Sequence, residues 1–209
     1  MTAWLVHELR ARGVKGVLYG SHTAIRQFIK QVNGTLVNVG SIDSGVPFVY
    51  QATYAASKAA VLSIARSVNQ ELRHAGNAKT IRIATVMPWA ADTPWWPHAA
   101  NYSGRAPRMA MMDDPQKVVD SMVWVSLHPR EELPVGWKAQ ASFSAHHIFH
   151  DLVERVSANI QRAELDKASQ APPTSGSLHQ PMASGTTVDG GIRERMRQED
   201  KARREEKPR

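Results

Sequence analysis

Helical and strand patterns alternate along the first half of this chain, and the alternation limits the folds open to it. Residues 16 to 32 carry apolar side chains at helical spacing, and residues 51 to 76 do so again over a longer stretch. The apolar runs Thr35 to Val39 and Ile81 to Met87 predict two buried strands. Helices and strands in this order predict an α/β fold, with a parallel sheet covered by helices.

Further elements are predicted downstream. Asp114 followed by Pro115 is typical of an N-cap and a first helical residue, so a helix is expected to begin there. Pro134 to Phe143 predicts a last strand, and residues 146 to 167 predict a helix with one apolar side. Small, polar and charged residues then dominate. We therefore expect one domain over residues 1–167 and a polar, disordered tail over 168–209.

Tyr54 and Lys58 stand four residues apart on the longer predicted helix, with Ser41 thirteen residues before Tyr54. Positions i and i+4 share one face of a helix, so the phenol and the ammonium point at one site. A nearby ammonium favours the phenolate, so Tyr54 could exchange a proton closer to neutral pH than its free pKa of about 10 allows. Ser41 follows the first predicted strand, where its hydroxyl could bind a substrate oxygen. Together the three could polarise a carbonyl or an alcohol.

Three segments carry these residues and extend the pattern beyond them. They are Gly34-Thr35-Leu36-Val37-Asn38-Val39-Gly40-Ser41, Tyr54-Ala55-Ala56-Ser57-Lys58-Ala59-Ala60 and Glu71-Leu72. The segments resemble the catalytic half of the short-chain dehydrogenases/reductases. This resemblance implies a Rossmann-type doubly wound parallel sheet. It also implies an oxidoreductase that moves hydride between NAD or NADP and an alcohol/carbonyl pair.

The same resemblance assigns roles to the three side chains. Tyr54 would be the general acid/base, and Lys58 would lower its pKa and hold the nicotinamide ribose. Ser41 would orient the substrate oxygen. Ser44, ten residues before Tyr54, competes for this last role, but its neighbours Asp43 and Gly45 predict a turn, so Ser41 is preferred.

A later segment, Val86-Met87-Pro88-Trp89-Ala90-Ala91-Asp92-Thr93, looks like the family's Pro-Gly-x-x-x-Thr stretch, with Trp89 at the usual glycine. The resemblance implies that Pro88 and Thr93 contact the cofactor, together with Tyr54 and Lys58. Trp95 and Trp96 follow where the family carries a mobile flap over the substrate. An aromatic flap would favour an apolar or ring-containing substrate. Rings that only cover the edge of the sheet explain these residues equally well.

The segment before Ser41 is too short for the family's usual first half. Only 40 residues precede it, whereas one strand–helix–strand unit takes about 30 or more. No glycine-rich nucleotide motif occurs there, and Gly13, Gly16 and Gly20 are predicted to serve a helix start and its packing. We therefore expect a sheet truncated at its amino-terminal half, without the dinucleotide-binding part. The residue that separates NAD from NADP falls in that part, so the choice of cofactor is not readable.

Two further consequences follow from the resemblance. Gly13 stands where the family places an asparagine that anchors a water in the proton relay. The helix over residues 51–76 is the family's oligomerising helix, which implies a homo-oligomer. The alternative to an oxidoreductase is therefore a non-catalytic remnant that lacks a cofactor site and acts, if at all, through oligomerisation.

The formal charge of +7 raises the question of a nucleic-acid partner. Residues 193 to 209 hold eight basic and five acidic side chains and no aromatic ring. Mixed charges of this density are typical of a solvated helix or a disordered tail, so nucleic-acid binding is not expected.

Three other classes of function are not favoured. The chain has no cysteine, which excludes disulfides and thiolate metal sites and fits a cytoplasmic location. No run of 18 apolar residues predicts a membrane span. His146, His147 and His150 lack a carboxylate at the spacing of a known zinc motif, so surface histidines and no metal site are predicted.

Overall fold

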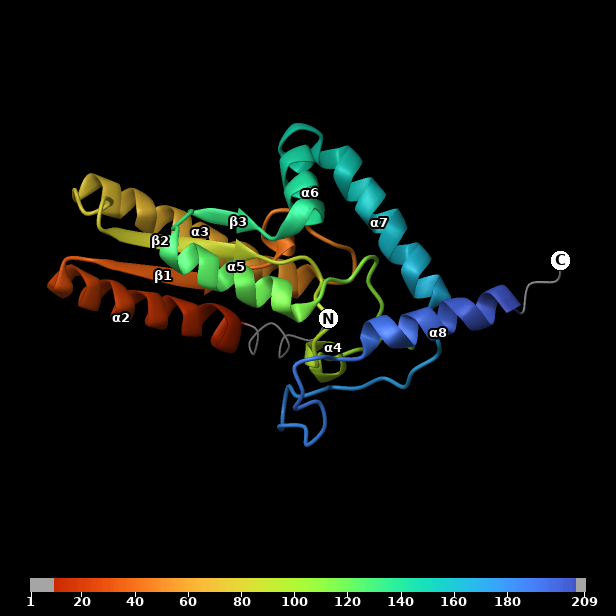
Figure 1. The fold of residues 1–209 in the computed structure, drawn as a ribbon. Helices are drawn as coiled ribbons and strands as arrows, with labels where there is room; N and C mark the ends of the chain where they lie inside the picture. The colour runs from red at the N-terminus through yellow and green to blue at the C-terminus, as the bar shows by residue number, and fades with distance from the viewer. Residues whose placement is uncertain (1–9, 206–209) are drawn as a thin grey trace. The chain divides into compact units, whose positions relative to one another are not determined.

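The computed structural model describes residues 10–205, drawn in Figure 1, and the chain divides into two compact units. The first comprises the chain up to Trp89 together with Lys117–Arg155, and the second comprises Ala90–Gln116 and the chain from Val156 onward. The two units therefore alternate along the sequence. The predicted division at residue 167 falls elsewhere and stays a prediction.

The first unit is built on a three-stranded parallel sheet in the order β1-β2-β3 (Figure 1). Its elements are the π-helix η1 (Arg10–Lys15), α2 (Gly16–Gln31), β1 (Gly34–Val39), the 3-10 turn η2 (Ile42–Ser44), α3 (Ala52–His74), β2 (Ile81–Met87), α5 (Pro115–Leu127), β3 (Glu132–Pro134), α6 (Gly136–Ile148) and the start of α7 (His150–Lys167). The helix and strand order predicted for residues 16 to 87 is confirmed. An α/β fold with a parallel sheet is present.

Helices cover both faces of the sheet because β2 is apolar on both sides. Ile81 and Ile83 point to one face, where they pack with side chains of α2 and α3. Ala84 and Val86 point to the other face and pack with Val125 of α5. This two-sided burial is the arrangement of a doubly wound sheet, and it fixes the carboxyl ends of β1 and β2 side by side.

The predicted strand over Pro134 to Phe143 is wrong. Strand β3 ends at Pro134, and α6 begins at Gly136, whose φ of +76° lies in the left-handed region. A backbone turned in this way cannot continue the ladder. The residues after it, with Lys138 and Ala139 near the start, favour a helix. The predicted helix over 146 to 167 is confirmed from His150 onward and is separated from α6 at Phe149.

Asn69 on α3 completes the hydrogen bonding of β2 where β3 is too short to reach. Its Nδ2 donates to the Ile83 carbonyl at 2.8 Å, and its Oδ1 accepts from the Ile83 N–H at 3.1 Å. Asn69 is 3 % exposed, so no water can replace these bonds readily. The Asn69 side chain therefore forms the two hydrogen bonds to Ile83 that a neighbouring strand would otherwise form. It also links α3 to the sheet.

We expect Asn69→Ala to lower the free energy of unfolding by about 2 kcal/mol, because it leaves two buried backbone groups without partners. Urea denaturation followed by circular dichroism would measure this. Ser67→Ala, on an exposed position of the same helix, is the control and should change stability by less than about 0.5 kcal/mol. Equal stability of the two variants would show that Asn69 does not support β2.

The second unit contains α4 (Trp95–His98), most of α7 and α8 (Ile192–Glu205). Asp92 caps α8 from another part of the chain, since its carboxylate accepts from the N–H groups of Ile192 (2.8 Å) and Arg193 (3.0 Å). Arg108 is 1 % exposed and forms ion pairs that join α7 and α8. Its partners are Glu164, Glu199 and Asp200.

The sequence predicts a disordered tail from residue 168, whereas the structure places α8 within it. The helix has a physical cause in the capping by Asp92 and in charge pairs at helical spacing, such as Arg197 with Glu194. Predicted N-capping by Asp114 is confirmed at α5, where its carboxylate accepts from the Gln116 N–H at 2.9 Å. None of the helices within residues 10–205 is long and apolar enough to cross a membrane.

Candidate functional site

The close approach of β1 and β2 beyond their last paired residues positions Ser41. The Gly40 N–H donates to the Val86 carbonyl at 2.8 Å. A Cβ on Gly40 would lie 2.9 Å from the Thr85 side chain, so this position requires glycine. The Ile42 N–H then donates to the carbonyl of Pro88 at 2.9 Å. Ser41 and Pro88 are thereby held at adjacent carboxyl ends of a parallel sheet, where α/β proteins bind ligands.

Ser41 and Ser44 cap the turn η2 reciprocally. The Ser41 Oγ accepts from the Asp43 N–H at 3.2 Å, and the Ser44 Oγ accepts from the Ser41 N–H at 3.1 Å. This arrangement is a capping box. Ser44 therefore serves the local fold, whereas the Ser41 hydroxyl also reaches the side chain of Tyr54. The geometry favours Ser41 over Ser44 for contact with a substrate oxygen.

Tyr54 and Lys58 lie on one face of α3, as their spacing predicts. The Lys58 Nζ lies 5.7 Å from the centroid of the Tyr54 ring and donates to the Val39 carbonyl at 2.9 Å. The Tyr54 hydroxyl hydrogen-bonds the Ser41 side chain. One hydroxyl, one phenol and one ammonium therefore meet beyond the end of β1.

The predicted lowering of the Tyr54 pKa is not found. Burial raises the pKa of the Tyr54 phenol above its ordinary value, the hydrogen bond from Ser41 opposes this, and the charge of Asp43 adds to it. Burial also lowers the pKa of the Lys58 ammonium. The lysine bonds a backbone carbonyl and lies against the ring of Tyr54. The effect of burial on the Tyr54 pKa is therefore the largest one, and Tyr54 is protonated at neutral pH.

Asp43 is a neighbour of this site that sequence reasoning missed. It is 4 % exposed, and burial raises the pKa of its carboxyl to about 7, partly offset by a hydrogen bond from the Phe48 backbone. Ionised Asp43 acts electrostatically on Tyr54. The sequence Asp43-Ser44-Gly45 predicts only a turn. An acidic residue two positions after Ser41 was the available signal.

The remaining predicted cofactor contacts fall in different units. Pro88 directly follows the last residue of β2. The ring of Trp89 contacts Phe48 edge to face at 5.7 Å between centroids, so this tryptophan packs against the loop after η2. Thr93 belongs to the second unit, where its N–H donates to the Ala91 carbonyl at 3.0 Å. The first unit thus contains Ser41, Tyr54, Lys58 and Pro88, whereas Thr93 belongs to the second unit.

The aromatic segment after Thr93 forms α4. Trp95 and Trp96 meet edge to face at 5.1 Å between centroids, and the Trp96 Nε1 donates to the Ala91 carbonyl at 2.8 Å. Trp95 remains 44 % exposed. Trp96 therefore has a structural partner, and the two interpretations of this segment, a substrate flap or a cover for the fold, stay open.

Gly13 lies where the resemblance places the relay asparagine, and the structure shows what surrounds it. A Cβ on Gly13 would lie 3.7 Å from the side chain of Ser57, the residue before Lys58. The Ser57 hydroxyl itself donates to the Tyr54 carbonyl at 2.7 Å within the helix. A larger side chain at position 13 would thus point toward the helix that carries Tyr54 and Lys58. Glycine offers no polar group there.

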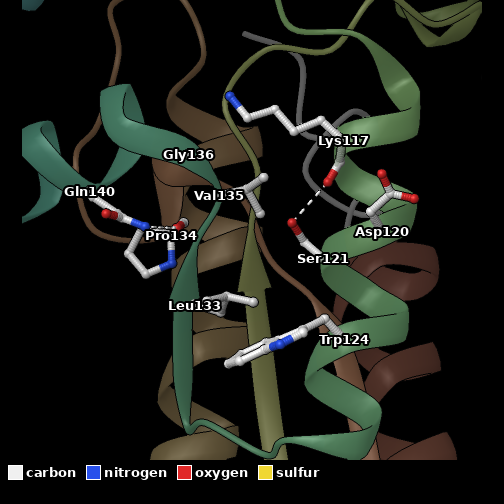
Figure 2. A pocket seen from close by; sticks show the side chains of 9 residues that line it. All are labelled: Lys117, Asp120, Ser121, Trp124, Leu133, Pro134, Val135, Gly136 and Gln140. Carbon is white, nitrogen blue, oxygen red and sulfur yellow. Dashed lines mark hydrogen bonds between the residues drawn. The ribbon is translucent and has the colours of Figure 1, made fainter.

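Two other features are separate from this cluster. Among residues 10–205 no three His, Cys, Asp or Glu side chains gather to hold a metal ion, and His146 bonds Glu154 at 3.0 Å. Figure 2 shows a pocket of about 380 Å³ between α5, β3 and the start of α6, with Trp124 and Lys117 on its α5 side. None of the predicted site residues lines this pocket.

Comparison with known proteins gives consistent matches. A family model described as short chain dehydrogenase matches residues 5–101. The "Uncharacterized oxidoreductase YxnA" of Bacillus subtilis is 28 % identical over 148 residues, which make up 69 % of this chain and 41 % of that protein. The "Uncharacterized oxidoreductase SSP0419" of Staphylococcus saprophyticus is 35 % identical over 82 residues, 39 % of this chain and 33 % of that protein. The chain thus spans less than half the length of these relatives.

Solved structures give the same result at the level of the fold. A short-chain dehydrogenase from Streptomyces avermitilis is similar at a TM-score of 0.58 and 20 % identity, covering 75 % of this chain and 63 % of that one. A short chain dehydrogenase from Burkholderia cenocepacia, solved in complex with NADP, has a TM-score of 0.54 and 22 % identity, covering 71 % and 58 %. At these identities the likeness shows the fold alone, which is the Rossmann-type fold that the sequence predicts.

Proposed function

Because a family model of short chain dehydrogenases matches residues 5–101, we propose that this chain is a member of that family and acts as an NAD(P)-dependent oxidoreductase on an alcohol/carbonyl pair, with Tyr54 as acid/base. One observation carries the proposal. The Tyr54 hydroxyl bonds the Ser41 side chain at the carboxyl end of β1, with the Lys58 ammonium beside the same ring. A substrate oxygen placed between Ser41 and Tyr54 would accept a hydrogen bond from each.

The groups near Tyr54 fit one end of a nicotinamide cofactor. Lys58 provides an ammonium and Tyr54 a hydroxyl at one place, which suits the hydroxyls of a ribose. When bound, the nicotinamide would supply or accept the hydride. Within residues 10–205 no glycine-rich turn joins a strand to a helix, so these residues do not form the usual binding site for the pyrophosphate of the cofactor. The fit therefore covers the ribose end, and the choice between NAD and NADP stays open.

The protonation of Tyr54 favours one direction of reaction. Burial keeps the pKa of the phenol above its ordinary value, so Tyr54 carries its proton at neutral pH. A protonated phenol can donate to the oxygen of a carbonyl that becomes an alcohol, while Ser41 holds the same oxygen. At neutral pH Tyr54 would therefore be in the protonated form that carbonyl reduction requires.

The second candidate is a non-catalytic member of the family that acts through oligomerisation. Within the described sheet β1 pairs only with β2, so its other edge is unpaired, and such edges favour association. Apolar side chains also stay exposed on α5, including Val123 at 58 % and Leu127 at 73 %. Under this candidate α3 would join subunits and no nucleotide would bind.

Titration of the purified, folded chain with NADPH and NADH, followed by nucleotide fluorescence, tests the proposal. We expect saturable binding of at least one nucleotide, weakened about tenfold or more by Lys58→Met, because the ammonium is lost from the ribose site. Lys79→Met removes an equal charge from an exposed position and should bind as the wild type does.

Each outcome separates the two candidates. Binding that depends on Lys58 supports the oxidoreductase and justifies a screen of carbonyl substrates. A folded chain that binds neither nucleotide would contradict it, and sedimentation would then show whether the chain associates as the second candidate requires.

A further inference from the structure

A buried carboxylate lies beside the Ser41–Tyr54 pair and has no part in the chemistry proposed above. Asp43 occupies the middle of η2, the turn that Ser41 caps, and is 4 % exposed. Its carboxylate accepts a hydrogen bond from the Phe48 backbone. The Oδ1 atom is buried without a hydrogen-bond partner among the described residues. Such a carboxylate is only partly satisfied, and this calls for an explanation.

Packing around η2 keeps Asp43 away from water. The α6 ring of Phe143 lies against Gly45, where a Cβ would come within 2.4 Å of it. Val46, in the same loop, is fully buried. Charges interact more strongly in such surroundings than in water. A change of charge on Asp43 therefore acts on Tyr54, a titratable group on α3.

We propose that Asp43 is a positioning residue that acts through Tyr54. While its carboxylate is ionised, the negative charge of Asp43 opposes deprotonation of the Tyr54 hydroxyl. This effect is lost when the Asp43 carboxylate is protonated. The consequence for turnover rests on the proposed function: a phenol serves carbonyl reduction, whereas alcohol oxidation requires a phenolate. Ionised Asp43 thus extends to higher pH the range in which Tyr54 remains a phenol and can serve carbonyl reduction.

Other titratable groups near η2 must be told apart from Asp43. On α3 these are Tyr54 itself and Lys58, whose ammonium bonds the Val39 carbonyl. Helix α6 carries Lys138, His146 and His147. His147 bonds the Phe143 carbonyl at 2.7 Å. The test must therefore remove Asp43 specifically.

The test follows the Tyr54 ring directly, with no cofactor or substrate present. The full chain is prepared with tyrosine labelled with ¹³C at the ζ carbon, and spectra are recorded from about pH 5 to about pH 11. The chain has four tyrosines, so Tyr54→Phe assigns the signal. We expect a small step in the Tyr54 signal near neutral pH, followed by its own deprotonation at high pH. Asp43→Asn should abolish the step and shift the deprotonation to lower pH.

Glu71→Gln is the matched control. It removes one negative charge from an exposed position on α3, about 25 Å along the helix from Tyr54. Both features of the Tyr54 titration should survive in this variant. A merely structural role of Asp43 would leave the Tyr54 deprotonation in place.

The outcomes are decisive in each case. A neutral-pH step that persists in Asp43→Asn belongs to another group and overturns the proposal, as does an unchanged Tyr54 deprotonation. If circular dichroism finds the variant unfolded, the wild-type titration decides alone, since a Tyr54 signal without the step excludes the coupling. Failure of nucleotide binding would not alter these spectra, so the two proposals fail separately.

Discussion

Replacing Tyr54 by phenylalanine should lower the turnover of a carbonyl substrate by at least about 100-fold, because proton transfer by a positioned side chain contributes about 10² to 10⁴. The substitution removes only the hydroxyl that bonds Ser41. The ring can still pack, and the Lys58 ammonium can still bond the Val39 carbonyl. Nucleotide affinity should therefore fall much less than turnover, and steady-state kinetics with fluorescence titration would measure both.

Tyr50→Phe provides the control for this experiment. Tyr50 lies four residues before Tyr54 and its side chain is 77 % exposed, so loss of its hydroxyl should leave turnover within about twofold. A Tyr54→Phe enzyme that keeps the wild-type rate on an identified substrate would exclude Tyr54 as the acid/base. Loss of structure in Tyr54→Phe alone, seen by circular dichroism, would instead point to a packing role for the hydroxyl.

The fold of the first unit could be predicted because its strands are apolar on both faces. Within β2, Ile81 and Ile83 face one side of the sheet and Ala84 and Val86 face the other, and only a strand covered on two sides buries both sets. The error at Pro134 to Phe143 has a local cause. The left-handed φ of Gly136 ends β3 early, and the pattern of apolar residues does not predict a backbone angle.

The site could be predicted as far as spacing determines it. The i and i+4 positions of Tyr54 and Lys58 fix their common helix face, and the glycine before Ser41 allows the sheet to close behind it. The direction of the Tyr54 pKa could not be predicted, because it depends on burial by residues distant in sequence. Phe143, about a hundred residues further along the chain, lies against Gly45 in the turn that carries Asp43, and no spacing rule contains this contact.

Asp43 should make the stability of the wild-type chain fall with rising pH. Its pKa is raised from 3.8 to about 7 in the folded protein, so the folded state binds the proton more tightly than the unfolded state does. Stability from this group is therefore complete at acid pH and is lost as pH rises through about 7. The shift corresponds to roughly 4 kcal/mol in total, of which about 3 kcal/mol falls between pH 5 and pH 8.5.

Asp43→Asn cannot ionise and should escape this loss. We expect the variant to exceed the wild type in free energy of unfolding at about pH 8.5, and the advantage should shrink by roughly 3 kcal/mol on going to about pH 5. Urea denaturation at both pH values would measure the difference, with Glu71→Gln as the exposed-charge control. A difference between variant and wild type that does not change with pH would mean that Asp43 does not titrate in this range. The carboxylate would then have a partner that keeps it ionised, and its charge on Tyr54 would be constant rather than switchable.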